Sequence, residues 1–355
     1  MEVFKVKRHI RFGAKCGIFL LILLVCVKFT NILLTPKYFY TNDWPTTSTY
    51  VGFYQMDKDT VDVIFLGSSH AVSGFSPQQL YNEYEIRSYN LGCEQQNLVT
   101  SYFWLKEALR YQTPEVIVLD TYLLFPQENV GPLNSIEGCT RKAFDFMKWS
   151  PIKMEAVHQI CGIDSTQDRL SYYMPNIRYH ARWTELDKED YASLGMFTKF
   201  ELKGYSMLEK ESGIQNFNPF DIGEKQEKEQ IMEYMEKYLL EVIELCKKED
   251  IQLLLVKTPC IYETENRYHA TKAIAEHYDI PFLDFNEKSM YHDLGYCFET
   301  DNYDSGHANM RGAQKLTTYI GDLLVKEFEV TQQYDIQWEQ TKQYYEEVSR
   351  ESGLH

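Results

Sequence analysis

The sequence lacks the residue spacings that mark a bound metal ion. Eight cysteines are spread over 355 residues, with no C-x-x-C pair and no cysteine–histidine spacing of a zinc site. We therefore expect neither a metal nor another cofactor. Asn-x-Ser/Thr sites are also absent, which is more typical of an exported bacterial protein than of a eukaryotic one. Six of the cysteines follow residue 35, but sequence alone does not say whether they form disulfides.

Basic residues are scarce outside the N-terminal segment. The chain holds 36 Lys and Arg against 52 Asp and Glu, a formal net charge of −16. Residues 1–28 carry six of the basic residues and only one acidic residue, so the remainder is more acidic than the whole. Such a body would repel a polyanion before contact. We therefore expect no nucleic-acid partner.

Only one long apolar run is present, and it lies near the N-terminus. Residues 16–27 are continuously apolar and the pattern resumes at 32–34, so residues 13–34 are long enough to cross a bilayer. The basic residues precede this run, which predicts residues 1–12 in the cytoplasm and the rest outside a cell membrane. A cleaved secretory signal is the alternative, although no small-x-small cleavage site follows the run. Both interpretations export the body of the chain.

The next residues predict a tether followed by an α/β domain. Residues 35–60 are polar and aromatic, with two prolines, and we interpret them as a tether. From 61 to 328, short apolar runs alternate with stretches of helical periodicity, which predicts a three-layer fold with a parallel five-stranded sheet. The strands are expected at 62–66, 86–91, 115–119, 252–258 and 281–285, and the helices at 77–84, 95–111, 224–249, 263–278 and 310–328.

Two segments stand outside this alternation. Residues 126–223 are too long for a bare loop, and we expect an inserted cap over the strand ends. Within it, the run YHARW at 179–183 is open to two interpretations, substrate contact or stabilisation of the cap. The tail, 329–355, is expected to be a terminal helix or a frayed extension.

A Gly-Ser-Ser turn follows the first predicted strand. The apolar run 61–66 ends at Gly67, and Ser76-Pro77 has the form of an N-cap followed by the first residue of a helix. A serine at such a strand-to-helix turn has an exposed hydroxyl with backbone N–H groups nearby, as acyl transfer requires. The alternative is that Ser68 and Ser69 are only turn residues.

A second motif precedes the last predicted helix. Asn309 can cap that helix, which leaves Asp304 and His307 in the loop before it. An aspartate three residues before a histidine can hold the imidazole Nδ1–H and leave Nε2 free to take a proton from a serine. The two motifs would complete a triad in the order Ser, Asp, His. A capping loop with a surface histidine is the alternative.

Together the motifs resemble the SGNH (GDSL-type) hydrolase superfamily. The resemblance covers roughly 62–125 and 224–328, and it implies a flavodoxin-like sheet. Gly67-Ser68-Ser69-His70 is similar to the family's Gly-Asp-Ser-Leu, which makes Ser69 the nucleophile, with Asp304 and His307 as its dyad. The glycine of Asn90-Leu91-Gly92 matches the family's second oxyanion donor, the first being the N–H of Ser69.

The sequence departs from the family pattern after the third strand. The family has an asparagine there as an oxyanion donor, whereas this chain has Asp120-Thr121-Tyr122. A carboxylate would oppose a developing oxyanion. Thr121 or Asn97 could substitute, or the N–H groups of Ser69 and Gly92 could act alone.

The resemblance also indicates a function. The run 62–70, the Tyr-Asn-Leu-Gly at 89–92 and the His-x-Asn-x-x-Gly-Ala at 307–313 look like the membrane-anchored exported branch, which includes D-alanyl transfer and alginate acetylation proteins. It implies serine-dependent O-acyl transfer or ester hydrolysis on a cell-envelope polysaccharide or other glycan, beside a membrane-bound O-acyltransferase. The alternative is a non-catalytic envelope protein that uses the fold to bind glycan or that membrane partner.

Overall fold

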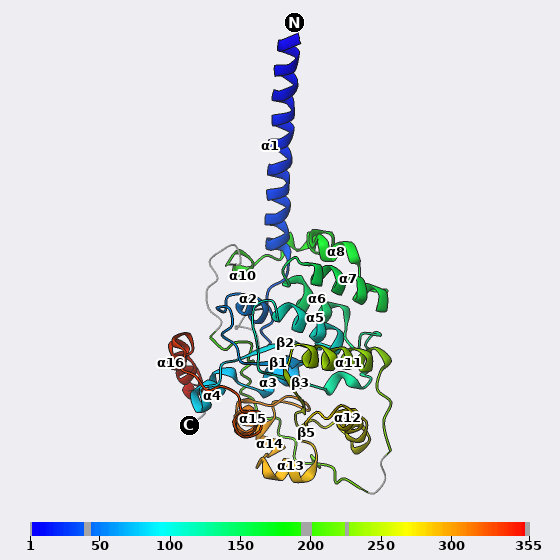
Figure 1. Cartoon of the computed structure of the whole chain (residues 1–355), viewed down its shortest axis with the longest axis vertical. Coiled ribbons are helices and arrows are strands. Elements are labelled where there is room, and N and C mark those ends of the chain that lie inside the picture. The colour runs from blue at the N-terminus through cyan, green and yellow to red at the C-terminus, as the bar shows by residue number, and fades with distance from the viewer. Residues whose placement is uncertain (1, 39–43, 193–200, 224–226, 352–355) are drawn as a thin grey trace. The chain divides into compact units, whose positions relative to one another are not determined.

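The computed structural model describes residues 2–38, 44–192, 201–223 and 227–351 (Figure 1). They belong to two compact units. One comprises Met1–Lys37 with Asp168–Thr198, and the other comprises Tyr38–Gln167 with Lys199–His355.

The second unit is built on the predicted parallel sheet. Its five strands lie in the order β2-β1-β3-β4-β5, the flavodoxin-like order, and every pairing is parallel. The three central strands are apolar and buried because helices cover both faces (Figure 1). The strands are β1 (Val63–Gly67), β2 (Ser88–Gly92), β3 (Val116–Asp120), β4 (Gln252–Lys257) and β5 (Phe282–Asp284), each close to its predicted range.

Helices form the outer layers. Helix α5 packs against both α7 and α11, and α15 packs on α3 and α4. The core beneath α4 and α15 joins Leu80, Leu316 and Ile320 to strand residues such as Phe65 and Val118. The helices of this unit are α2 (Thr47–Phe53), α3 (Ser69–Gly74), α4 (Pro77–Tyr84), α5 (Leu98–Ala108), η1 (Tyr122–Leu124), α6 (Glu137–Asp145), α7 (Pro151–Ile163), α11 (Glu233–Lys248), α12 (Glu265–Tyr278), α13 (Lys288–Asp293), α14 (Phe298–Asp301), α15 (Met310–Lys326) and α16 (Ile336–Glu351).

The predicted helix starts at 77 and 310 are confirmed. The Ser76 hydroxyl accepts a hydrogen bond from Gln79 N, and the Asn309 side chain accepts bonds from Arg311 N and Gly312 N. The predicted start at 224 lies outside the described residues, and the prediction of helix over 227–232 is wrong, since α11 begins at Glu233. The preceding chain is held elsewhere: Met232 N donates to Leu124 O at 3.1 Å.

The structure differs from the predicted tether and cap, and it contains the terminal helix that was one of the two forms predicted for the tail. Residues 47–53 of the predicted tether (35–60) form α2, whose Tyr50 and Phe53 are fully buried because α2 packs on β2. The predicted cap, 126–223, is divided: 126–167 and 201–223 belong to the α/β unit, and 168–192 belong to the unit of the N-terminal helix. In the tail, 329–355, α16 packs on α4, with Trp338 buried against Tyr81.

One edge of the sheet is covered by a distant segment. β2 is an edge strand, and its Asn90 N donates a hydrogen bond to Lys203 O at 3.0 Å. The backbone of residues 203–204 therefore lies along the open side of β2.

The first unit contains the long N-terminal helix α1 (Glu2–Leu34). Its residues His9–Leu34 have a mean hydropathy of 2.5 over an 18-residue window, long and apolar enough to span a membrane, in keeping with the predicted anchor at 13–34. Four short helices lie in residues 168–192 of this unit, and three of them contact α1. They are α8 (Arg169–Tyr173), α9 (Asn176–Tyr179), η2 (His180–Thr184) and α10 (Lys188–Ala192).

Candidate active site

The turn after β1 places Ser69 at the first position of α3. Gly67 has φ +146, a conformation that L side chains rarely adopt, and a Cβ there would lie 2.4 Å from Asp120 Cβ. Glycine is therefore required for the chain to leave the sheet so sharply. Ser68 caps α3 by accepting a hydrogen bond from His70 N, and Ser69 follows it.

The structure brings Ser69, His307 and Asp304 into one hydrogen-bonded chain. Ser69 Oγ lies 2.8 Å from His307 Nε2, although the two residues are far apart in sequence. His307 Nδ1 lies 2.9 Å from each carboxylate oxygen of Asp304. With Nδ1 donating to Asp304, Nε2 is left to accept the Ser69 proton, which is the arrangement of a general base beside its nucleophile.

The loop before α15 fixes the Asp304 carboxylate. Its Oδ1 accepts hydrogen bonds from the backbone N–H groups of Gly306, at 2.9 Å, and His307, at 3.0 Å. Burial alone would raise the pKa of Asp304, but the bonds and charge of His307 and these N–H groups lower that pKa to about 2. Asp304 is therefore ionised at neutral pH and can stabilise an imidazolium.

Trp44 packs against the His307 ring. The two ring centroids lie 4.8 Å apart at an interplanar angle of 61°, and Trp44 also meets Tyr303 edge-on at 6.4 Å. Trp44 comes from the stretch predicted as a tether. It restricts the orientation of the imidazole and covers part of it from solvent.

Asp120 holds the neighbouring serine rather than an oxyanion. Its Oδ2 accepts bonds from Ser68 Oγ, at 2.6 Å, and Ser68 N, at 3.1 Å, while Oδ1 accepts from Tyr122 N at 2.9 Å. Burial raises the pKa of Asp120, and these hydrogen bonds act in the opposite direction. Asp120, at the position where the sequence resemblance leads one to expect an asparagine, thus fixes the turn that carries Ser69.

His70 is a neutral neighbour of the triad. It is buried, its Nδ1 lies 3.1 Å from Thr258 Oγ1, and its ring stacks on Tyr122 at 3.8 Å. Burial, with the charge of His307 (ring centroids 5.0 Å apart), holds the pKa of His70 well below its usual value. His70 is therefore neutral at neutral pH and adds no charge beside His307.

The predicted oxyanion donors differ in availability. Gly92 pairs in register with Gly67, at the strand ends beside Ser69. Asn97 caps α5 through its carbonyl oxygen, and its buried Nδ2 has no hydrogen-bond partner among the described residues. Thr121 is occupied, because both its N–H and its hydroxyl donate to Val256 O. Of the two substitutes that the sequence suggested, Asn97 alone retains a free donor.

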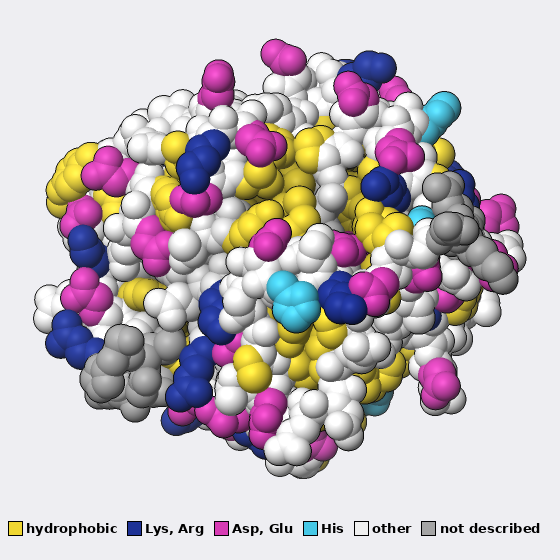
Figure 2. All heavy atoms as spheres, turned by 90° about the horizontal axis from the view of Figure 1, so that it is seen from below, with side chains coloured by type: hydrophobic (Ala, Val, Ile, Leu, Met, Phe, Trp, Pro, Cys, Tyr) yellow, Lys and Arg dark blue, Asp and Glu magenta, His cyan; other side chains and the backbone are white. Residues whose placement is uncertain are grey.

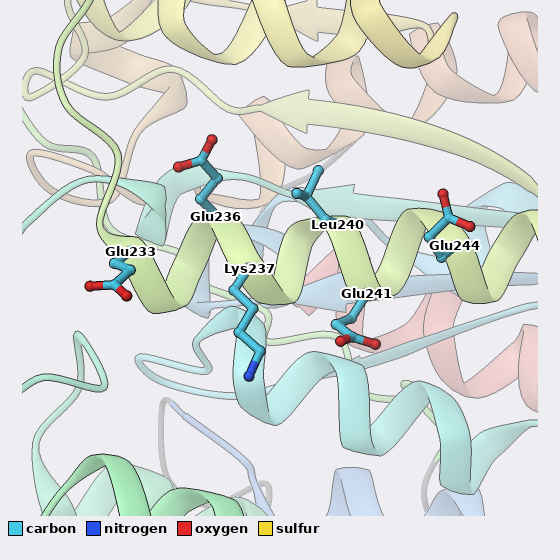
Figure 3. Close-up of a pocket in the computed structure, with 6 residues that line it drawn as sticks. All are labelled: Glu233, Glu236, Lys237, Leu240, Glu241 and Glu244. Atoms are coloured by element: carbon cyan, nitrogen blue, oxygen red, sulfur yellow. The ribbon is translucent and has the colours of Figure 1, made fainter.

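Other surface features lie apart from this site. On the face drawn in Figure 2, acidic and basic side chains are interspersed around apolar areas. A hollow of about 430 Å³ follows α11 (Figure 3) and is lined by Lys237, Leu240 and four glutamates, none of them a triad residue.

No group of three or more His, Cys, Asp or Glu side chains within the described ranges could hold a metal ion. Seven cysteines within those ranges form no disulfide: Cys16, Cys26, Cys93, Cys139, Cys246, Cys260 and Cys297.

The chain has distant likenesses among solved structures. No protein-family model matches the chain, and no curated protein matches it. Among solved structures, the chain is similar to a GDSL-like lipase from Bacteroides thetaiotaomicron, with 11% sequence identity and a TM-score of 0.37. That alignment covers 79% of this chain and 98% of the lipase chain.

Proposed function

We propose that this protein is an SGNH-type serine enzyme that transfers or hydrolyses O-acyl groups. The observation that supports the proposal is the hydrogen-bonded chain from Ser69 Oγ through His307 to Asp304, at 2.8 and 2.9 Å. The alternative for these residues was a capping loop with a surface histidine. Such a loop needs neither the contact between Ser69 and His307 nor an Asp304 carboxylate with both oxygens near His307 Nδ1.

The geometry supports an acyl-enzyme mechanism. Ser69 Oγ attacks the acyl carbonyl while His307 Nε2 takes its proton, and His307 then returns that proton to the departing alcohol oxygen. An ester joins the acyl group to Ser69. Water or a second hydroxyl attacks this ester, gives its proton to His307, and Ser69 leaves with that proton.

Stabilisation of the tetrahedral oxyanion is assigned to three donors. The N–H of Ser69 is at the first position of α3, where backbone N–H groups lack intrahelical partners. The N–H of Gly92 and the Asn97 amide are the others. Each such donor is commonly worth about 2.7–4 kcal/mol of transition-state stabilisation.

The proposed setting is the outer face of a cell membrane. We infer that α1 is a single-pass anchor, with the basic residues of its N-terminal turns in the cytoplasm and the α/β unit outside. The substrate class we propose is an O-acylated envelope glycan, and a membrane-bound O-acyltransferase is the proposed acyl supplier. The sequence resemblance supports these two assignments.

A fluorophosphonate probe tests the catalytic proposal on the full-length chain in detergent. Intact-mass and peptide analysis should place one adduct on Ser69, and Ser69→Ala should abolish it. With an activated acetyl ester, the same substitution should lower the rate on the order of 10⁴–10⁶-fold. Ser73→Ala, one turn further along α3, is the matched control and should keep the adduct.

Two outcomes decide between enzyme and binding protein. A folded chain that never labels, and whose acyl-ester turnover is unchanged by Ser69→Ala, would exclude the triad mechanism. Glycan binding retained in Ser69→Ala would then favour the non-catalytic alternative. Transfer of the acetyl group to an oligosaccharide, with little release to water, would identify a transferase.

A further inference from the structure

Residues 169–192 are attached to the last turns of α1. Asn176 N donates to Asn31 Oδ1 at 2.9 Å, and Asn176 Nδ2 donates to Thr30 Oγ1 at 2.7 Å. Arg182 Nη1 donates to Leu34 O at 2.8 Å. Because these partners lie at the C-terminal end of the apolar span His9–Leu34, the attached segment lies at the boundary of that span.

The attachment is reinforced by a buried charge network. Asp190, 1% exposed, pairs with Arg182 at 2.9 Å and with Lys37 at 3.5 Å. Lys37 Nζ also donates to the carbonyls of Ile32 and Leu33. Two cationic side chains thus satisfy three carbonyls at the C-terminus of α1, where the helix dipole favours positive charge. The segment 169–192 is therefore fixed to the helix end and not merely next to it.

The same segment exposes large apolar side chains. Trp183 is 71% exposed and Leu170 is 65% exposed, although neither residue type favours water. Met174, Ile177 and Tyr191 are also exposed. Tryptophan and tyrosine are enriched where a bilayer meets water, because an amphipathic ring is stable at the level of the head groups.

We propose that residues 169–192 form a collar that lies in the lipid–water interface of the bilayer crossed by α1. The exposed apolar side chains contact the head groups and the upper part of the acyl chains, because the collar is attached to the end of the spanning helix. The inference rests on the anchor proposed above and is independent of the chemistry at Ser69. The run at 179–183 thereby acquires a role other than substrate contact.

Tryptophan fluorescence in vesicles tests the collar. The chain has five tryptophans, none of them in α1, so the helix contributes no signal of its own. The full-length protein is placed in phosphatidylcholine–phosphatidylglycerol vesicles that contain lipids brominated either near the head group or near the acyl-chain end. We expect head-group-proximal bromine to quench Trp183 more strongly. Trp183→Phe should lose this component, whereas Trp149→Phe, which removes another exposed tryptophan, should keep it.

Each other outcome overturns the collar. Equal quenching of the wild type and Trp183→Phe would show that Trp183 does not meet lipid. Stronger quenching by bromine at the chain end would place the residue in the hydrocarbon core. If Trp183 were shielded from bromine quenching only when another membrane protein co-purified with the chain, the exposed side chains would contact a protein and not lipid. Release of the chain by alkaline carbonate would overturn the anchor and the collar together, yet would leave fluorophosphonate labelling of Ser69 unaffected.

Discussion

Ser68 and Ser69 are adjacent and chemically alike, but their surroundings give them different tasks. The Ser68 hydroxyl is bonded to Asp120 and the Ser69 hydroxyl to His307. A carboxylate that accepts three hydrogen bonds at a sharp turn limits the freedom of that turn. Ser69 is therefore presented to His307 by a preorganised backbone, which an oxyanion site also needs.

Burial of His70 in its neutral form predicts a loss of stability in mild acid. The folded-state pKa of His70 lies well below 6.5, so below about pH 6.5 the unfolded chain binds a proton that the folded chain does not. Stability is thus fully present above pH 6.5 and falls as the pH drops, by up to about 1.4 kcal/mol per pH unit from this residue. Denaturant unfolding at pH 7.5, 6 and 5 should show the slope.

The substitution His70→Asn should reduce that slope, since an amide at the Nδ1 position cannot titrate in this range. Thr258→Val is the control, because it removes the contact to Nδ1 but leaves His70 in place. Equal slopes in the wild type and His70→Asn would contradict the assignment of a neutral buried imidazole.

Site residues that depend on local chain geometry could be predicted from the sequence. Asp304 and His307 are three residues apart, so a short loop brings them together, and the Gly-Ser-Ser turn marks the serine. Trp44 and the role of Asp120 could not be predicted. Their contacts with His307 and Ser68 arise from packing between distant parts of the chain, for which neither residue carries a local pattern.

At the scale of elements, the strands and the helices between them were predicted because their signals are strong. A buried parallel strand is a continuous apolar run, and a capped amphipathic helix has a defined start. The helix α2 was missed because Thr47–Phe53 has little helical propensity and becomes ordered through burial of Tyr50 and Phe53. The start of α11 was misplaced because the residues before 233 have a helical composition, but Glu229 N donates to Asn266 O of α12 and Met232 N to Leu124 O of η1.

The contact between α15 and α4 depends on the absence of a side chain at Gly321. A Cβ there would lie 2.3 Å from Tyr84 Cε2 and 2.9 Å from Leu80 Cδ1. Gly321→Ala should therefore force the helices apart and destabilise the protein by about 1–3 kcal/mol, as overpacking commonly does. Thermal or denaturant unfolding measures the change.

A second glycine provides the matched control. Gly162 lies in α7, and a Cβ there would have no neighbour within 4 Å. Gly162→Ala should be neutral or stabilise by up to about 1 kcal/mol, since alanine is the better helix former. A destabilisation of equal size at both positions would show that packing at α4 is not the cause.

At the scale of the whole molecule, the exposed thiol of Cys297 makes the proposed orientation of α1 testable. Cys297 is exposed on the α/β unit, whereas the two cysteines of α1 lie within the apolar span. A membrane-impermeant maleimide added to intact cells that express the chain should label Cys297 if this unit is outside. The labelled peptide can be identified by mass spectrometry.

The control for this labelling is Cys297→Ser, which should lose most of the signal in intact cells. Lysed cells provide the reference for full accessibility. Labelling of Cys297 that appears only after lysis would place the α/β unit in the cytoplasm and reverse the inferred orientation of α1.

The cover along β2 has a consequence for solubility and assembly. A bare edge strand is a template on which another chain can add a strand, and such pairing is a common route to aggregation. Here the backbone of residues 203–204 occupies that edge, through the bond from Asn90 N to Lys203 O. Protection of this edge against pairing with another chain thus depends on a segment far along the sequence. A chain that is cleaved, or not yet synthesised, as far as residue 203 would leave the edge of β2 unpaired.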